Sequence, residues 1–462
     1  MPRKKHILLF TVLAVTAAIV WLAVWAVRAR SSMYAYDTRR DHVYDFRRSG
    51  AIVTDLPLRD GRVVLSRRHG SDHTAFLKVD VDAAWSGRLF QPRIVIAGEK
   101  RSVTQYLEHG AAGIRYLNIS SLPPDSAGGL TLRGKYAAVR DQTVQLVMFR
   151  NPSPGAMKIL VVAPHPDDAE IAAYGLYSDN RRSHIVTVTA GDAGPNNYDE
   201  ISLAKARQYL KKGQLRTWNS ITVPLLGGIP SEQIVNLGFF DATLASMYRS
   251  RSLPVRGRFT QASDISTFRR QNVSSLGCGL TGGADWHSLV ANLEYLLRQI
   301  GPDAIVAPYP ALDKHPDHKL SSIALFEAIR KAGMTRGRLY LYTNHFVLNA
   351  YYPYGEAGSA VTLPPNSRKP VYFDGIYSHA LSHDKQVDKL FALEAMNDLR
   401  LDTEWRFAGG AVGLAIASLK RDASGKEKSY FRSAVRSNEL FFVVEIENLY
   451  NEKILNEIKG EL

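Results

Sequence analysis

The chain has 462 residues, enough for roughly two or three domains, and 45% of them are hydrophobic, which permits large cores and argues against global disorder. A single cysteine, Cys278, excludes an internal disulfide framework and a cysteine-rich metal site. The formal net charge of +14 favours anionic surroundings such as phospholipid head groups or phosphorylated glycans, but not nucleic acid, because Lys and Arg are spread along the chain and form no recognised binding module.

The chain opens with an uncharged apolar run, Ile7–Val27. This run is close to the ~20 residues that a helix needs to cross a hydrocarbon core. A cleaved signal peptide is the alternative, but its apolar core is usually ~7 to 15 residues long, and no small-residue cleavage pattern follows here. We therefore predict a single transmembrane anchor over residues 1–30.

The orientation of this anchor is weakly encoded, because basic residues flank the apolar run on both sides. A short basic amino terminus in front of a first span commonly stays in the cytoplasm. We expect an inner-membrane protein with a periplasmic or extracytoplasmic catalytic region, and the cytoplasmic face is the alternative.

Residues 31–150 are predicted to form a second domain. The polar stretch Ser31–Asp45 is typical of a juxtamembrane linker, and the rest alternates in short segments separated by turn signals such as Asp60-Gly61. This spacing predicts a small β-sandwich. Its aromatic residues could stack on a sugar or fill the core, and the fold alone does not choose between the two. The candidates are Trp85, Tyr106 and Tyr116.

Residues 156–462 are predicted to form the largest domain, with a carboxyl-terminal extension. Strand-like and helix-like segments alternate, with strands expected at 158–163, 184–189, 221–226 and 303–307. This alternation predicts an α/β fold with a doubly wound, mostly parallel sheet. The stretch 239–285 has no long periodic element, so it is either a functional lid or a set of short elements that the pattern misses.

Two polar clusters follow apolar runs in this domain. His165, Asp167 and Asp168 come after the first strand, and His315 and His318 follow another strand. Open α/β sheets place their chemistry at such strand ends. Histidine and carboxylate suit zinc, and three protein ligands with one open position are usual at a catalytic site. The alternative is that these aspartates merely cap the helices that follow, as Asp317 could do for its own helix.

The clusters resemble motifs of the PIG-L/LmbE family of zinc-dependent de-N-acetylases, whose members act on N-acetylglucosamine in lipid-linked, thiol-linked or antibiotic precursors. The resemblance covers about Lys158–Arg400 and implies a Rossmann-like sheet. The matching segments are His165-Pro166-Asp167-Asp168-Ala169-Glu170, Thr189-Ala190-Gly191-Asp192-Ala193-Gly194 and His315-Pro316-Asp317-His318.

Position by position, the resemblance implies that His165, Asp168 and His318 bind zinc, or another divalent metal. It further implies that Asp167 is the general base and that His315 polarises the amide oxygen or protonates the leaving amine. Asp241 falls where the family often carries an acid, but the match is too loose to give it a role. The pair His379 and His383 has metal-ligand spacing, and we expect it to have a structural or substrate-rim role.

The sequence therefore indicates a membrane-anchored, zinc-dependent de-N-acetylase for an N-acetylated amino sugar in an envelope glycan or a lipid-linked saccharide. Zinc lowers the pKa of bound water from ~15.7 toward ~7, and Asp167 would take the proton as this water attacks the amide. Alternatives are a glycan-binding or assembly protein with little turnover, and an amidase for another sugar-conjugate amide. A serine nucleophile is disfavoured, because no Gly-x-Ser-x-Gly elbow is present.

Overall fold

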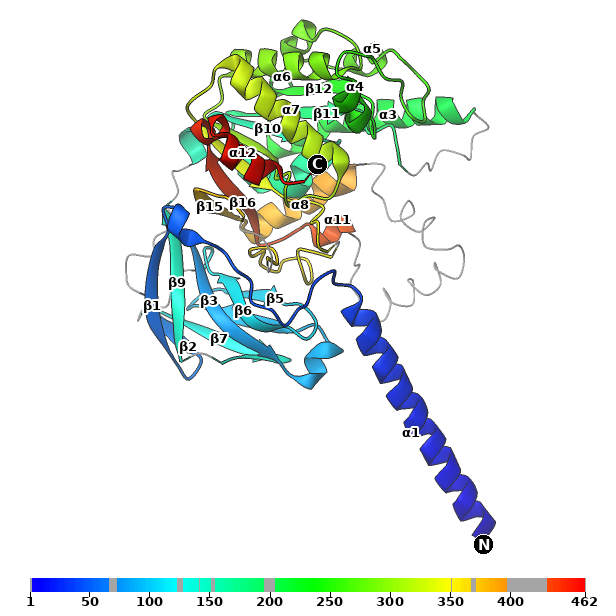
Figure 1. Cartoon of the computed structure of the whole chain (residues 1–462), viewed down its shortest axis with the longest axis vertical. Helices are drawn as coiled ribbons and strands as arrows, with labels where there is room; N and C mark the ends of the chain where they lie inside the picture. Colours follow the sequence, from blue (N-terminus) through cyan, green and yellow to red (C-terminus); the bar gives the residue numbers. More distant parts are fainter. Residues whose placement is uncertain are drawn as a thin grey trace.

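The computed structural model describes residues 2–65, 73–122, 128–140, 142–150, 154–194, 204–349, 351–366, 371–396 and 430–461. Helix α1 (Pro2–Ser31) projects away from the rest of the chain, with the amino terminus at its far end (Figure 1). Its part Phe10–Ser31 is long and apolar enough to cross a membrane, a property that a signal sequence would share.

A first sheet follows α1 and is antiparallel throughout its described pairs. Its strand order is β5-β4-β7-β2-β1-β9-β3-β6, and β8 pairs with β3. The strands are β1 (Ile52–Arg59), β2 (Arg62–Val64), β3 (His73–Ala83), β4 (Arg93–Ala97), β5 (Ser102–Tyr106), β6 (Ala112–Asn118), β7 (Gly129–Lys135), β8 (Ala137–Val139) and β9 (Thr143–Arg150). Two short 3₁₀ helices, η1 (Phe46–Arg48) and η2 (Trp85–Arg88), flank or join these strands.

The predicted β-sandwich differs from the structure in one respect, because its two halves are joined into one sheet. Strand β1 pairs with β9 over residues 52–57 and with β2 at Leu58 and Arg59, so it connects both halves into one nine-stranded sheet. The sheet folds around its own apolar core, which includes Leu77, Ile94 and Leu146. The predicted turn at Asp60-Gly61 is confirmed: both residues have positive φ, as a tight hairpin turn requires.

The second sheet carries the predicted α/β part. Its strand order is β12-β11-β10-β13-β14-β16-β15. The first five strands in this order run parallel, whereas β16 is antiparallel to both of its neighbours. The strands are β10 (Ile159–Ala163), β11 (Ser183–Thr189), β12 (Ile234–Phe239), β13 (Ala304–Pro308), β14 (Arg338–Tyr342), β15 (Gly375–Ala380) and β16 (Asn438–Glu445). A parallel sheet is thus present in part, and antiparallel pairs predominate among all described strands.

Helices cover both faces of this second sheet, which explains why β10 is apolar at every position. Leu160 and Val162 face one core, whereas Ile159, Val161 and Ala163 face the other. The helical elements are η3 (Pro154–Ala156), α2 (Asp168–Ser178), α3 (Lys205–Thr222), η4 (Val223–Gly227), η5 (Ser231–Gln233), α4 (Leu244–Ser250), α5 (Ser266–Arg269), η6 (Ser275–Gly279), α6 (Trp286–Ile300), α7 (Pro316–Ala332), α8 (His383–Ala395), α11 (Tyr430–Ser433), η8 (Ile446–Tyr450) and α12 (Glu452–Lys459).

Two secondary-structure expectations need correction. The predicted strand at 221–226 is the end of α3 followed by η4, where Pro224 lies in the first turn of the 3₁₀ helix, and the actual strand β12 lies further along the chain. The stretch 239–285 contains α4, α5 and η6, so short helical elements were missed. The role of this stretch as a lid stays a prediction.

The segment that was expected to be a free linker, Ser31–Asp45, is packed into the molecule. Tyr34, Tyr36 and Tyr44 are buried in the same core as residues of both sheets. The Tyr36 hydroxyl donates to Glu108 (3.1 Å) and shares a 2.6 Å hydrogen bond with the Tyr354 hydroxyl. The linker prediction is therefore wrong, because alternate aromatic side chains bury themselves between the two sheets. The domain limits 31–150 and 156–462 stay predictions.

Helix α2, which begins at the first polar cluster, is kinked at Ala173, where φ is −143°. The Glu439 carboxylate accepts hydrogen bonds from the N–H groups of Gly175 (2.9 Å) and of the next residue (3.0 Å). On the other side of the kink, Lys389 Nζ donates to the Ile171 carbonyl (2.9 Å) and to Glu439 (2.8 Å). This buried ion pair binds the backbone groups that the kink leaves without helical partners.

Candidate metal centre

The two predicted clusters meet at the carboxyl ends of two neighbouring strands. β10 and β13 pair directly in parallel, and the strand order reverses between them, which is where open α/β sheets form their binding crevices. His165 lies in the turn between β10 and α2, and Asp168 is the first residue of α2. His318 lies in the first turn of α7, which Pro316 starts with its fixed φ.

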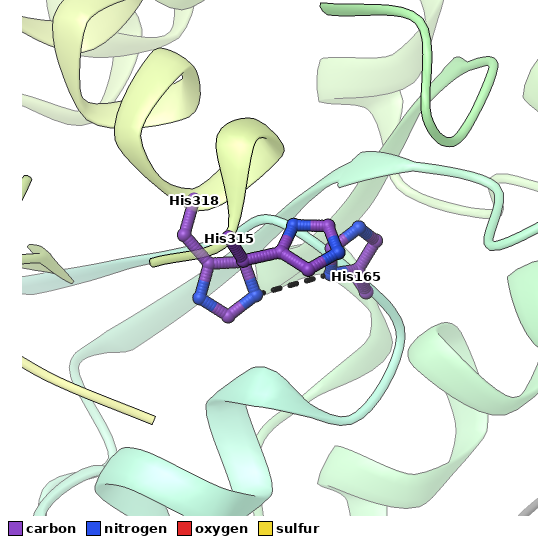
Figure 2. A group of neighbouring side chains, drawn as sticks. All are labelled: His165, His315 and His318. Carbon is purple, nitrogen blue, oxygen red and sulfur yellow. Dashed lines mark hydrogen bonds between the residues drawn. The ribbon is translucent and has the colours of Figure 1, made fainter. Parts of the chain in front are cut away.

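Three side-chain atoms at this crevice form a nearly equilateral triangle. His165 Nδ1 lies 3.2 Å from His318 Nε2 (Figure 2). The Asp168 Oδ2 atom lies 3.2 Å from His165 Nδ1 and 3.1 Å from His318 Nε2. All three side chains are almost entirely buried. The structure thus brings together the three residues that the family resemblance implies as zinc ligands.

The triangle fits one face of a tetrahedral metal site. Zn²⁺ binds histidine nitrogen and carboxylate oxygen at about 2.0–2.2 Å, which places neighbouring ligand atoms about 3.3–3.5 Å apart. The observed separations of 3.1–3.2 Å need only a small expansion to accept an ion. Two imidazoles and one carboxylate are also a usual donor set for catalytic zinc with one open position.

His318 and Asp168, the two candidate ligands on α7 and α2, each contact a second polar group on the side away from the triangle. His318 Nδ1 lies 3.0 Å from Asp313 Oδ2, and both side chains are completely buried. Asn344 Nδ2 donates to Asp168 Oδ1 at 2.7 Å, so the second carboxylate oxygen remains directed at the triangle. Such contacts fix the orientation of metal ligands and, at histidine, the tautomer.

The other nitrogen of His165, Nε2, faces two further carboxylates. Nε2 lies 3.1 Å from Asp241 Oδ1 and 3.7 Å from Asp317 Oδ2. Burial opposes a charge on this imidazole, but the Asp241 carboxylate and hydrogen bonds to the surrounding aspartates raise its pKa well above the usual value. Asp317 also accepts the N–H of Ala242 (2.7 Å), while His315 occupies the cap position of α7, so the capping role considered for Asp317 is wrong.

These three groups form an alternative metal triad of His165, Asp241 and Asp317. A metal there would bind the opposite nitrogen of the His165 ring from the one in the triangle. We prefer the triangle, because it leaves Asp241 on the outer nitrogen of His165, and a carboxylate there is the usual partner of a metal-binding imidazole.

Asp167 lies next to Asp168 in the chain, but its side chain is directed at a different partner. Its side chain is 13% exposed, and Oδ2 accepts a 3.0 Å hydrogen bond from Arg216, whose guanidinium also donates to the Pro166 carbonyl. Burial raises the pKa of Asp167; Arg216 opposes the shift and the nearby Asp168 carboxylate adds to it. Asp167 is therefore an oriented carboxylate with increased basicity.

His315 lies over the triangle. Its ring centroid is 4.8 Å from that of His165 and 4.9 Å from that of His318 (Figure 2). Its Nδ1 is buried and has no hydrogen-bond partner among the described residues. Burial, together with the charges on His165 and His318, lowers the pKa of His315 to about 4. His315 is therefore a neutral imidazole near pH 7, and its atoms also permit a group of three histidines around one ion.

Several residues of the centre were missed in the sequence. Asp313, two positions before His315, could have been noticed by its spacing, but Asn344 and Arg216 carry no local signal and reach the site only through folding. Asp192, in the Thr189–Gly194 segment, accepts the N–H of Asp241 (2.8 Å), and burial raises its pKa to about 7.

The histidine pair near α8 is not a metal site in the described structure. His379 lies on β15 and contacts Asp179 (2.9 Å), whereas His383 begins α8 and its side chain is 90% exposed. The idea that they share a helix face is wrong, because the strand ends between them. A structural role for His379 agrees with its contact to Asp179.

Comparison with known families gives one match over the metal centre. Residues 160–329 match the family model PIG-L, described as GlcNAc-PI de-N-acetylase. This range contains both clusters. A search of curated protein sequences finds no match.

The solved structures that match this chain are remote in sequence and have low TM-scores. The A40926 pseudoaglycone deacetylase Dbv21 shares 18% identity over 63% of this chain and 98% of its own, with a TM-score of 0.32. The zinc-inhibited form of teicoplanin deacetylase Orf2 shares 14% identity over 62% and 98%, with a TM-score of 0.34. The conserved protein TT1542 from Thermus thermophilus shares 18% identity over 62% and 94%, with a TM-score of 0.32. Similarity at this level does not transfer a function.

Proposed function

We propose that this chain is a metal-dependent hydrolase that removes the acetyl group from an N-acetylated amino sugar, because residues 160–329 match the PIG-L family model. The observation that carries this proposal is the buried triangle of His165 Nδ1, His318 Nε2 and Asp168 Oδ2. These three residues would hold the metal, for which Zn²⁺ is the best fit. When bound, the metal supplies a Lewis acid for the amide carbonyl and lowers the pKa of water.

Asp167 is the proposed general base. Its Oδ2 already accepts from Arg216, so Oδ1 is the atom that would take the proton from the attacking water. The raised pKa of the buried carboxyl improves it as a proton acceptor at neutral pH. After addition to the carbonyl, the protonated Asp167 would return the proton to the sugar nitrogen, which then leaves as an amine.

His315 is the proposed donor to the oxygen that becomes negative during attack. A neutral imidazole keeps one N–H, and a buried nitrogen without a partner is free to bind a substrate atom. The lowered pKa argues against His315 as the acid that protonates the amine, since it carries no spare proton near pH 7. Asp167 is therefore the group that would give the proton to the leaving nitrogen.

We further propose that α1 anchors the enzyme in the inner membrane and that the catalytic part lies on the extracytoplasmic side. An anchored enzyme suits a lipid-linked saccharide or an envelope glycan, both of which stay at the membrane. The apolar span supports the anchor, and the near balance of basic residues around it leaves the choice of side to experiment.

Acetate release tests the proposal. The full chain, purified and supplied with Zn²⁺, should release acetate from N-acetylated envelope saccharides. An Asp167→Asn variant should not, whereas Asp384→Asn, at a fully exposed carboxylate on α8, should match the parent. Release of a longer acyl group instead would favour the amidase alternative. Binding of saccharide by the metal-loaded protein without any turnover would favour a glycan-binding protein.

A further inference from the structure

We propose that one end of the first sheet contacts the lipid surface beside α1. The contact is made by a membrane-contact patch, which we define as the aromatic and basic residues on and just after η2 and at the end of β7. It comprises Trp85, Arg88, Phe90, Lys135 and Tyr136. This inference rests on the membrane anchor of the proposed function and goes beyond it by assigning a second lipid-binding element.

The patch is apolar and open. The side chains of Trp85 and Phe90 are 66% and 55% exposed, unusually high values for large aromatic residues in this sheet. Phe90 stacks on Tyr136 with ring centroids 5.2 Å apart, and Lys135 Nζ lies 5.5 Å from the Tyr136 ring. Arg88, on η2, is a second exposed cation in addition to Lys135 of β7. A cluster of exposed rings with cations at its edge marks an interaction surface.

The position of the patch is set by its contact with α1. η2 packs against this helix. Residues 10–22 of α1 are exposed, whereas Ala23, Ala26 and Val27, which share one helix face, are half-buried. These residues belong to the last turns of the uncharged run. The covered face of α1 therefore lies at the end of the membrane span, where the helix emerges from the bilayer.

The residues directly after α1 fix the position of the first sheet relative to this helix. Tyr34, three residues past the helix, is buried; its hydroxyl lies 2.9 Å from His109 Nδ1 and accepts the His109 N–H at 2.9 Å. Tyr36 continues the attachment through Glu108. Since η2 and these attachment points belong to the same sheet, an inserted α1 places the patch at a fixed height near the membrane surface.

The chemistry of the patch fits the head-group region of an anionic bilayer. Trp and Tyr prefer this region, where an amphipathic ring meets both water and acyl chains. Trp21 and Trp25 are exposed on the adjoining part of α1 and would lie near the same level. Lys and Arg close to the surface attract anionic lipids. A second copy of this chain is the less favourable occupant, because each copy carries a net charge of +14.

Site-specific labelling tests the contact. In a Cys278→Ser background, single cysteines at Phe10, Ala84 and Leu253, each exposed, receive an environment-sensitive fluorophore. The full chain is reconstituted into phosphatidylcholine–phosphatidylglycerol vesicles with a lipid-borne quencher at head-group depth. We expect quenching at 84 to be several-fold greater than at 253, and to fall toward the value at 253 when Trp85→Ser and Phe90→Ser are added.

The label at 10 separates the two proposals. If the label at position 10 is shielded from aqueous quenchers but the label at position 84 is quenched by the lipid-borne quencher no more than the label at position 253, α1 is inserted and the patch inference is overturned. If the label at position 10 is exposed to water, both the membrane-anchor proposal and the patch inference are overturned. The hydrolase proposal is then still tested separately by acetate release. An emission shift at 84 that depends on protein concentration in lipid-free micelles would assign the patch to a second copy and overturn the inference.

Discussion

The Asp313 carboxylate lies 3.0 Å from His318 Nδ1, and the same carboxylate accepts the backbone N–H groups of His315 (2.9 Å) and His345 (3.3 Å). One buried group therefore orients the imidazole in the triangle and joins the turn before α7 to the loop after β14. Asp313 touches no reacting atom, so we regard it as a positioning residue.

Replacing Asp313 tests this relationship. Asp313→Asn should weaken metal binding ~10- to 100-fold, since loss of the carboxylate removes the group that fixes the His318 tautomer. Competition with a chelator measures the affinity, with Asp384→Asn as the exposed control. Unchanged affinity in Asp313→Asn would show that the pairing is irrelevant to metal binding.

Asp167 and Asp168 are adjacent but have different proposed roles, so they form a matched pair. Asp168→Asn should lose most bound metal, because Asp168 Oδ2 is one corner of the triangle. Asp167→Asn should retain metal and lose acetate release by ~10²- to 10⁴-fold, the usual range for a general base. Elemental analysis and acetate assays on the same preparations give both readouts. Loss of metal from Asp167→Asn would move Asp167 into the ligand set.

His315 and His318, at the start of α7, allow a second comparison between a proposed catalytic residue and a proposed metal ligand. His318→Gln should abolish metal binding, whereas His315→Gln should keep the metal and lower kcat by ~10²- to 10³-fold, as removal of one donor to an oxyanion does. The three-histidine grouping predicts the opposite for His315→Gln, namely a marked fall in metal affinity. Metal titration of the two variants decides between these arrangements.

The buried Lys389–Glu439 pair should support α2 and thereby the centre. Glu439→Gln would leave the Lys389 charge buried without its partner, at a cost of ~3–5 kcal/mol in the free energy of unfolding. The double variant with Lys389→Met should recover part of this loss, since no unpaired charge remains. Urea denaturation of the detergent-solubilised chain measures the effect. A loss below that of the exposed Arg298–Glu294 pair, broken by Glu294→Gln, would contradict it.

The attachment of the segment Ser31–Asp45 to the first sheet should weaken in acid, because His42 Nε2 lies 2.9 Å from Glu108 Oε1 in a buried contact. Burial lowers the pKa of His42 below its ordinary value of 6.5, so the fold favours the neutral ring. Burial opposes a charge on Glu108, but the Arg115 guanidinium and the hydrogen bond from His42 outweigh it, so the pKa of Glu108 lies below its ordinary value of 4.5. Both pKa values are lower in the folded protein than in the unfolded chain, so the contribution of these groups to the free energy of unfolding is fully present above about pH 6.5. Protonation of His42 reduces this contribution as the pH falls below about 6.5, and protonation of Glu108 reduces it further below about 4.5.

Thermal unfolding between pH 8 and 4 measures this dependence. His42→Gln should flatten the upper part of the profile, between about pH 6.5 and 4.5, and leave the lower part in place. An unchanged profile in His42→Gln would assign the acid sensitivity to other groups.

Local patterns in the sequence identified a large part of this molecule. The uncharged run 7–27 predicts α1, and the continuous apolar run before His165 predicts a strand that is buried on both faces, as β10 is. The resemblance to the family motifs selected the residues of the triangle, and the place of both clusters directly after apolar runs predicted that they meet at one sheet edge. These features depend on neighbours within a few positions, which the sequence displays directly.

Other features arise from contacts between distant segments. The pairing of β1 with both β2 and β9 turns an expected sandwich into one sheet, and the tyrosines of Ser31–Asp45 become buried only when the two sheets meet. Asp313, Asn344, Asp241 and Arg216 come from four loops or helices, and no local pattern relates Asn344 or Arg216 to the triangle. The sequence determines which residues can bind a metal, whereas the tertiary structure decides which groups orient them, because orientation depends on packing across the whole sheet.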